Sequence, residues 1–267
     1  MLTLLKLGGE LLEDAAAMAR AADGIRALSA DGPLVIVHGG GRAIDADLRA
    51  RGVAPRFVDG IRITDSATLD SVLAVLAGRI NTAFVAALGA AGVDAVGLTG
   101  ADAWIGLSAN APPIQASTGE EVDPGLVGVP CEGGRPRLLI DLTRLGYVPV
   151  IATIGTTVDG ALLNVNADVL AAHLARAIQA DRFIVAGSTP GVFDASGSTC
   201  AFLDRAAARA MVAAGTARDG MVAKLNAALA AVDGGVTVVR IVDGRGAGYA
   251  DAQGTTVGAA QEAVTSC

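Results

Sequence analysis

Short apolar runs alternate with longer segments of helical periodicity along most of this 267-residue chain. The runs Thr3–Leu7, Pro33–His38, Val148–Thr153 and Arg182–Ala186 have the length and the nearly continuous hydrophobicity of strands that are buried on both faces. Parallel strands need crossover connections, and helices between buried strands supply them. The alternation therefore predicts an α/β fold with a largely parallel sheet that is covered by helices on both faces.

The same periodicities predict the remaining elements. Helices are expected at Asp14–Ser29, Ala43–Gly52, Thr64–Gly92, Arg137–Leu145, Ala167–Gln179, Asp204–Ala214 and Gly220–Val232, strands at Asp94–Leu98 and Val236–Val242, and a hairpin at Arg56–Thr64. A region rich in Gly and Pro, up to about residue 134, suits short hairpins. No repeat or low-complexity linker is present. We expect a single domain, residues 1–267, whose two lobes divide near residue 154.

Composition and charge exclude several classes of protein. The net charge of −7 disfavours non-specific binding to nucleic acid, which requires a basic face. No uninterrupted apolar stretch approaches the roughly 18 residues of a membrane-spanning helix, and the first residues lack the features of a signal peptide. Three scattered cysteines and two histidines predict neither a disulfide framework nor a metal site held by protein side chains. A cytoplasmic protein without membrane or nucleic-acid partners is expected.

Glycine clusters follow the first two predicted strands. Gly8-Gly9 comes directly after one strand, and Gly39-Gly40-Gly41 after the next. Ligands of open α/β sheets bind beyond the carboxyl ends of the strands, where glycine lets backbone N–H groups approach an anion. Tight turns also need glycine, so each cluster alone is weak support for a site. Neither is a Walker A or a Rossmann motif.

The chain has only two lysines, Lys6 and Lys224, against 18 arginines. Where only positive charge and solubility matter, either residue serves, so the two lysines are candidates for sites that need a compact ammonium group. Chance survival of two lysines in an arginine-biased chain is the alternative. Both lie in glycine-containing contexts that suit phosphate chemistry, and this favours function.

Two further segments contain candidate polar residues. In the run from Asn164 to Asp168, Asn166 can cap the following helix, and Asp168 can either favour the helix dipole or orient the two lysines. In the predicted hairpin, alternation places Arg62 on the face opposite Ile61. Arg62 can belong to a solvated strand face, or it can clamp a carboxylate in bidentate geometry. His38, near a strand end, is expected to be structural.

Taken in order, these segments resemble the amino acid kinase family, and within it the N-acetylglutamate kinases. The matching segments are Lys6-x-Gly8-Gly9, His38-Gly39-Gly40-Gly41, Gly60-x-Arg62-x-Thr64-Asp65, Asn164-Val165-Asn166-Ala167-Asp168 and Asp219-Gly220-Met221-x-x-Lys224, with further likeness at Ala95–Gly100, Gly146–Ile151 and Pro190-Gly191-Val192. The likeness covers nearly the whole chain.

The resemblance implies a three-layer α/β/α sandwich with a mainly parallel central sheet, an acyl-amino-acid site in an N-lobe of residues 1–154 and a nucleotide site in a C-lobe of residues 155–267. It implies phosphorylation of the side-chain carboxylate of N-acetyl-L-glutamate by ATP with Mg²⁺, the second step of arginine biosynthesis, with the metal bound mainly through the nucleotide phosphates. Its implied catalytic residues are Lys6, Lys224 and Asp168, its substrate-binding residues Gly40, Gly41, Arg62 and Asn164, and its nucleotide-binding residues Gly8, Gly9, Ser188, Gly191, Val192, Asp219, Gly220 and Met221.

Two departures from the family pattern bear on these expectations. The family often has Asp in a Ser-Asp-Val-x-Gly segment, whereas this chain has Ser188 followed by Thr189. The first strand also begins almost at residue 1, so the N-terminal helix through which arginine-inhibited members form hexamers is missing from this sequence. We expect an arginine-insensitive homodimer in which the helix Thr64–Gly92 forms the interface.

Three other functions compete with this interpretation. One is a kinase for a carrier-linked aminoadipate or glutamate, although such relatives tend to differ around the position of Arg62 and the acidic surface here disfavours a strongly acidic carrier. The second is a kinase for N-succinylglutamate. The third is a non-catalytic small-molecule sensor on the same fold, but a sensor has no transition state for Lys6, Lys224 and Asp168 to stabilise.

Overall fold

A computed structural model describes residues 1–194, 196–217, 220–246 and 248–258. An eight-stranded central sheet has the order β14-β16-β15-β13-β1-β2-β10-β5, and every pairing in it is parallel except that of β15 with β16. Its strands are β1 (Thr3–Leu7), β2 (Leu34–His38), β5 (Ala95–Thr99), β10 (Val148–Ala152), β13 (Arg182–Gly187), β14 (Phe202–Asp204), β15 (Val238–Asp243) and β16 (Gly254–Gly258). The mainly parallel sheet is confirmed.

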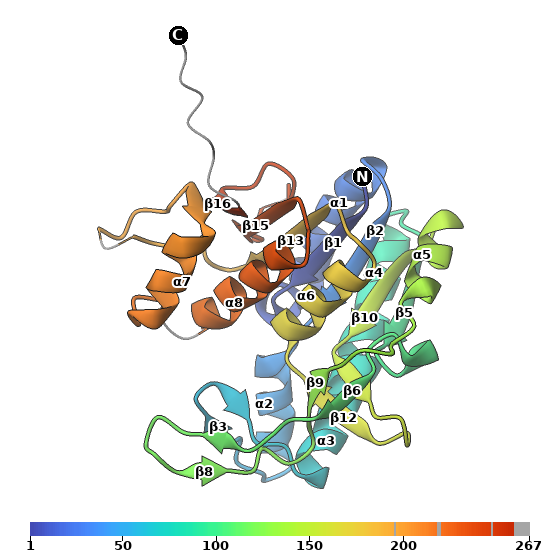
Figure 1. Cartoon of the computed structure of the whole chain (residues 1–267). Coiled ribbons are helices and arrows are strands. Elements are labelled where there is room, and N and C mark those ends of the chain that lie inside the picture. The colour runs from blue at the N-terminus through green and yellow to red at the C-terminus, as the bar shows by residue number, and fades with distance from the viewer. Residues whose placement is uncertain (195, 218–219, 247, 259–267) are drawn as a thin grey trace.

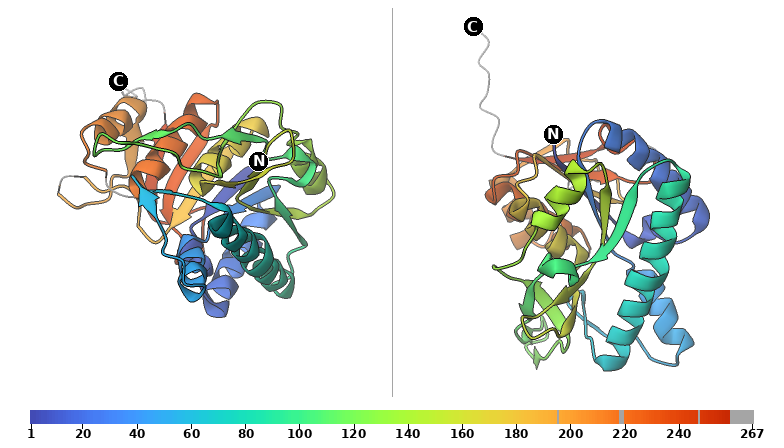
Figure 2. Two further views of the ribbon diagram at one scale, coloured as in Figure 1. Left: turned by 90° about the horizontal axis from the view of Figure 1, so that it is seen from below. Right: turned by 90° about the vertical axis from the view of Figure 1, so that its right-hand side faces the viewer.

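Helices cover both faces of this sheet, which completes the predicted three layers (Figures 1 and 2). One core contains side chains of α1 (Ala15–Ala30), α2 (Gly41–Ala50), α3 (Ser66–Leu73), the π-helix η2 (Ala74–Asn81) and α4 (Thr82–Ala90). The other contains those of α5 (Arg137–Arg144), α6 (Ala167–Ala177), α7 (Arg205–Ala213) and α8 (Gly220–Asp233). Successive side chains of β1 point to opposite faces of the sheet. Leu4 therefore packs in the core that contains α6, and Leu5 and Leu7 pack in the core that contains α1.

A smaller sheet and two hairpins lie beyond the central sheet, at the end of the molecule that also contains α2 (Figure 1). The sheet has the order β11-β12-β9-β6, from β6 (Ser108–Asn110), β9 (Val127–Pro130), β11 (Ile154–Thr156) and β12 (Leu162–Val165); the hairpins pair β3 (Phe57–Val58) with β4 (Ile61–Arg62) and β7 (Ile114–Gln115) with β8 (Glu121–Val122). Single turns of 3-10 helix lie at η1 (Gly9–Leu12) and η3 (Asp102–Trp104). The predicted hairpin at Arg56–Thr64 is thus β3–β4, and its turn residues Asp59 and Gly60 both have positive φ.

The strands β14, β16, β11 and β12 are absent from the predictions. Strands β11 and β14 have three residues each and β12 has four, and β16 is Gly-Thr-Thr-Val-Gly, without the apolar run that identifies a buried strand. Strands β11 and β12 follow the predicted lobe division near residue 154, yet they share a sheet with β9 and β6 of the N-terminal half, and β12 pairs directly with β9. The polypeptide therefore completes the small sheet before it returns to the central sheet through α6.

The segment Ser66–Ala90 is helical throughout but is not the uniform α-helix that the sequence predicts. Its middle third is the π-helix η2, a form that is uncommon and often lies at functional positions. By length and hydropathy alone the segment could cross a membrane. In this fold it covers the central sheet, packing against α1, β10 and β5, and its inward face contributes Val72, Leu76 and Phe84 to the core.

Candidate active site

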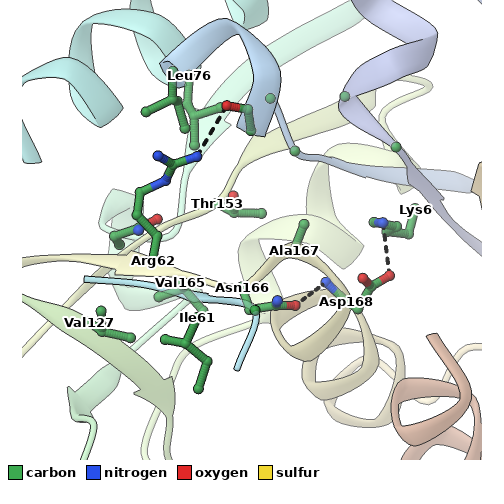
Figure 3. A pocket seen from close by; sticks show the side chains of 18 of the residues that line it. Lys6, Ile61, Arg62, Leu76, Val127, Thr153, Val165, Asn166, Ala167 and Asp168 are labelled. Atoms are coloured by element: carbon green, nitrogen blue, oxygen red, sulfur yellow. Dashed lines mark hydrogen bonds and ion pairs between the residues drawn. The ribbon is translucent and has the colours of Figure 1, made fainter. Parts of the chain in front are cut away.

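A cavity of about 260 Å³ opens at the carboxyl ends of β1 and β2. Its walls come from both glycine clusters, the hairpin β3–β4, β12 and the first turn of α6 (Figure 3). Eight of the sequence-predicted site residues line it: Lys6, Gly8, Gly9, Gly40, Gly41, Arg62, Asn164 and Asp168. Residues that are distant in sequence thus meet at one edge of the sheet, as expected for the carboxyl ends of parallel strands.

Lys6 and Asp168 form a buried ion pair. Because Leu5 and Leu7 face the core that contains α1, Lys6 projects from the other face of β1, toward the start of α6. Its Nζ lies 2.8 Å from Oδ1 of Asp168, and the two side chains are only 6% and 10% exposed. Asn166 fixes the position of Asp168, because Oδ1 of Asn166 accepts hydrogen bonds from the backbone N–H groups of Asp168 (2.9 Å) and Val169 (3.2 Å).

Lys224, on the first turns of α8, lies near this pair without joining it. Its Nζ donates to the carbonyl of Gly220 at 3.3 Å, and among the described residues it forms no ion pair. Burial lowers the pKa of Lys224, the positive charge of Lys6 lowers it further, and Asp168 and Glu10 oppose the shift. The predicted contact of Asp168 with both lysines is therefore found for Lys6 only.

The two glycine clusters pack directly against each other. A Cβ on Gly9 would lie 2.6 Å from the Cα of Gly40, so no side chain fits at Gly9, and a Cβ on Gly40 would lie 2.5 Å from Cδ1 of Ile80, which would have to move. Gly40 is also the N-cap of α2 and supplies no side-chain cap. The first N–H groups of α2 have no partner within the helix, and they lie beside Gly41 at the cavity wall. An anion can bind there.

His38 and Asn81 form a buried hydrogen-bonded chain that ends on Gly39, the first residue of the second glycine cluster. His38 is fully buried, and its Nδ1 donates to the carbonyl of Gly39 (3.1 Å), while its Nε2 accepts from Nδ2 of Asn81 (3.1 Å). Asn81 also donates to the carbonyl of Val150 at 2.9 Å. Burial lowers the pKa of His38 to about 4, although the hydrogen bond with Gly39 opposes this, so the ring is neutral. The expected structural role of His38 agrees with this environment.

Arg62 lies on the side of the cavity away from Lys6 (Figure 3), and Asn164 also lines the cavity. Arg62 donates from Nη1 to Asp45 (2.5 Å) and from Nη2 to the carbonyl of Gly41 (3.1 Å), and its guanidinium lies 4.6 Å from the ring centroid of Phe57. These bonds use two of the five N–H donors of the guanidinium group. Asn164 donates from Nδ2 to Oγ1 of Thr64 at 3.0 Å, which leaves its side-chain carbonyl as an acceptor.

Glu10 is a further cavity residue that the sequence analysis did not identify. Its carboxylate folds back over Gly8, and its Oε1 accepts a hydrogen bond from the N–H of Ser188 at 3.1 Å. The scarcity of lysine identified Lys6, four positions upstream, whereas Glu10 follows the strand and belongs to η1. Its position directly after Gly8-Gly9 was the one feature of the sequence that could have identified it.

The remaining predicted nucleotide-binding residues lie outside this cavity. Ser188 is exposed at the end of β13, and Gly220 and Met221 begin α8. Val192 is only 1% exposed, and both its backbone groups are engaged, its N–H with Oγ1 of Thr255 and its carbonyl with the N–H of Cys200. Gly191 packs against the same threonine. Val192 is thus a core residue, and nucleotide contacts by this group remain a prediction. Asp219 lies outside the described residues.

Comparison with known proteins decides the family. The profile of the amino acid kinase family matches residues 1–243. The chain belongs to this family. It is 41% identical over 250 residues to an acetylglutamate kinase of Solibacter usitatus, with 93% of each chain covered. It is 40% identical over 247 residues to an acetylglutamate kinase of Sphingopyxis alaskensis, covering 91% of this chain and 82% of the relative.

Solved structures extend the likeness to three dimensions. A protein of Streptococcus mutans superposes with a TM-score of 0.82 at 24% identity, covering 97% of this chain and 98% of the other. The N-acetylglutamate synthase of Neisseria gonorrhoeae, solved with coenzyme A and N-acetyl-glutamate, gives a TM-score of 0.81 at 24% identity, covering 96% of this chain and 58% of the synthase. At these identities the likeness concerns the fold. The amino acid kinase fold predicted from the sequence is therefore confirmed.

Proposed function

We propose that this member of the amino acid kinase family is an acetylglutamate kinase, which transfers the γ-phosphoryl group of ATP to the side-chain carboxylate of N-acetyl-L-glutamate. The observation that carries the proposal is one cavity with Lys6 and Asp168 on one side and Arg62 on the other. The acetylglutamate kinases at about 40% identity support the choice of substrate. The product, an acyl phosphate, would serve amino-acid biosynthesis in the cytoplasm.

The groups around the cavity suit two anionic substrates. Lys6, Lys224 and the uncapped start of α2 supply positive charge or N–H donors, and the glycine clusters allow close approach of phosphate oxygens. We infer that Lys6 and Lys224 hold the transferred phosphoryl group, while Gly8, Gly9 and the segment from Gly220 hold the nucleotide phosphates. ATP supplies the phosphoryl group, with Mg²⁺ bound mainly through its phosphates.

The acceptor requires no general base. A carboxylate is already a nucleophile at neutral pH, so the protein needs to align two anions and to neutralise the charge on the phosphoryl group in flight. Lys6 is suited to this task because Asp168 fixes its ammonium group within a site that excludes most water. A preorganised donor of this kind typically lowers a barrier by about 3–4 kcal/mol.

The far side of the cavity suits the body of N-acetyl-L-glutamate. Arg62 retains N–H donors for the α-carboxylate, and Asn164 retains a carbonyl that can accept the N–H of the acetamido group. Ile44, Leu76 and Val127 provide an apolar wall for the acetyl methyl group. At about 260 Å³ the cavity is smaller than the roughly 300–1,000 Å³ typical of sites for drug-sized ligands, which favours a small acyl amino acid.

We further propose two lobes that share the central sheet, with the acyl-amino-acid site toward the N-terminal half, and assembly into a homodimer through the outer face of Ser66–Ala90. Exposed small residues recur there at helical spacing, at Ala74, Gly78, Thr82 and Ala86, and such residues let two helices approach closely. Light scattering after size exclusion should give twice the 26.4 kDa of one chain. A monomeric mass would overturn this assembly.

Trapping of the product with hydroxylamine tests the function. With ATP and Mg²⁺, the protein is offered N-acetyl-L-glutamate, N-succinyl-L-glutamate, free L-glutamate and N-acetyl-L-aminoadipate in parallel. We expect a hydroxamate with N-acetyl-L-glutamate and little with the other three. A hydroxamate only with the succinyl or aminoadipate compound would replace the substrate and retain the chemistry. Absence of product with all four would contradict the proposal; retained ATP binding would then favour a carrier-linked substrate, and loss of ATP binding a sensor.

A further inference from the structure

Glu10 places a carboxylate among the groups that would bind phosphate. Its Oε1 accepts from the N–H of Ser188, and it lies 3.3 Å from the position that a Cβ on Gly187 would occupy. Cε of Lys224 lies 3.2 Å from the same position. Glu10 and Lys224 therefore approach the carboxyl end of β13 together, and Glu10 also lines the cavity that contains Lys6.

This carboxylate changes the charge of the site. Lys6, Lys224 and Asp168 together have one net positive charge, and Glu10 cancels it. A centre of zero net charge attracts a polyanion poorly, and a half-buried carboxylate beside the phosphate path repels it. When a divalent cation is bound to the phosphates, the carboxylate attracts the nucleotide instead of repelling it. Mg²⁺ in nucleotide sites is commonly held by one or two carboxylates together with phosphate oxygens.

We propose that Glu10 is a specificity-determining residue that selects the metal-bound form of the nucleotide, because its carboxylate repels the metal-free phosphates and attracts the cation that accompanies them. The inference rests on the proposed function, since it assumes that ATP binds at this edge of the sheet. It assigns a role to the residue that directly follows Gly8-Gly9. Asp168 does not supply this role, because its carboxylate is engaged by Lys6.

Glu10→Gln isolates the charge. Glutamine has nearly the same shape, and its side-chain oxygen can still accept from the N–H of Ser188, so the loop keeps its hydrogen bond. Glu13→Gln is the matched control, because Glu13 lies three positions further along the same segment, is 40% exposed and pairs with Arg42 at the surface. Glu10→Asp keeps the charge and serves as the conservative variant.

Isothermal titration with ATP, in EDTA and then in excess Mg²⁺, gives the ratio of the metal-free to the metal-bound Kd for each protein. We expect Glu10→Gln to lower this ratio about tenfold, the effect of one nearby charge in a half-exposed site. Glu13→Gln and Glu10→Asp should keep the ratio of the unmodified protein within about twofold. Thermal melting of each variant verifies folding independently of nucleotide binding.

Two results would overturn the inference, and they differ in what they say about the function. If the unmodified protein binds ATP with Mg²⁺ and Glu10→Gln leaves the ratio unchanged, the role of Glu10 is wrong and the proposed kinase activity stands. If the unmodified protein binds ATP under neither condition, the proposed function fails and the role of Glu10 fails with it.

Discussion

At the scale of single residues, the alternation of side chains along β1 determines the direction in which Lys6 points. Its neighbours Leu5 and Leu7 face one core, so its own side chain emerges on the opposite face of β1 and reaches the first turn of α6. The scarcity of lysine in the sequence identified this residue and Lys224 as candidates before any geometry was known. An ammonium group can follow a moving phosphoryl group as a compact point charge, whereas a planar guanidinium group has a fixed donor geometry.

Lys224→Arg tests whether the ammonium group itself is needed. We expect it to lower kcat at least about 100-fold, nearly as much as Lys224→Ala, because a planar guanidinium group cannot reproduce the compact charge of an ammonium group. The reverse exchange Arg137→Lys, at a side chain that is 85% exposed on α5, serves as the control and should leave kcat unchanged. Turnover near normal in Lys224→Arg would contradict the argument from lysine scarcity.

At the scale of elements, the π-helix η2 links the long helix to the active-site glycines. Asn81, its last residue, contacts His38, the carbonyl of Val150 and the backbone at Gly97. Periodicity alone predicted one regular helix here, because the buried residues Leu76, Ile80, Phe84 and Leu88 recur at a spacing of four, which an α-helix also gives. The wider π-helical turns are evident only in the structure, where they place Asn81 to bond with His38 and Val150.

Gly97→Ala should disturb this link. A Cβ at this position would lie 2.2 Å from Oδ1 of Asn81 and 3.3 Å from Cγ2 of Val85, so we expect a loss of about 1–3 kcal/mol in the free energy of unfolding. Gly89→Ala, with no atom within 4 Å of its new methyl group, is the control and should be neutral or slightly stabilising. Urea unfolding measures both. Equal stability of the two variants would show that the close contact between Asn81 and Gly97 of β5 does not matter for stability.

Neutral His38 predicts a specific pH dependence of stability. The folded protein holds its pKa at about 4, below the ordinary value of 6.5, so the unfolded chain binds more protons between these values. The free energy of unfolding should therefore rise by about 3 kcal/mol from pH 4 to pH 6.5 and then level off.

Urea unfolding across this pH range measures the effect. His173 also has a pKa lowered by burial, so the series is run in His173→Gln protein to remove its contribution. His38→Gln in that background should show a rise between pH 4 and 6.5 that is smaller by most of this amount, the remainder coming from aspartates with lowered pKa values such as Asp47 and Asp243. The same rise in both proteins would mean that His38 is not the group responsible.

At the scale of the whole molecule, the two halves of the chain share one sheet, with β1 paired to both β2 and β13. The order of buried strands and helices was predictable because each has a strong period of its own. The cavity was predictable in outline, since glycines at the ends of β1 and β2 must meet at one edge of the sheet. Eight predicted residues do line it.

Other features depend on contacts that a linear sequence does not reveal. Among the described strands, the three-residue strand β14 pairs only with β16, and β16, which has no apolar run, is held in the sheet by β15. Val192 was assigned to the nucleotide through the family resemblance, and nothing in the sequence indicated that its side chain is buried in the core beyond Gly191. Glu10 was missed because its importance lies in its proximity to Ser188 and Lys224, which are far away along the chain.

In the proposed reaction, the side-chain carboxylate of N-acetyl-L-glutamate attacks phosphorus directly. The most direct test uses substrate labelled with oxygen-18 in that carboxylate, with phosphorus NMR of the acyl phosphate formed from ATP. We expect a labelled oxygen bonded to phosphorus in the product, seen as an isotope shift of the phosphorus resonance. An unlabelled phosphoryl group, or no acyl phosphate at all, would contradict it.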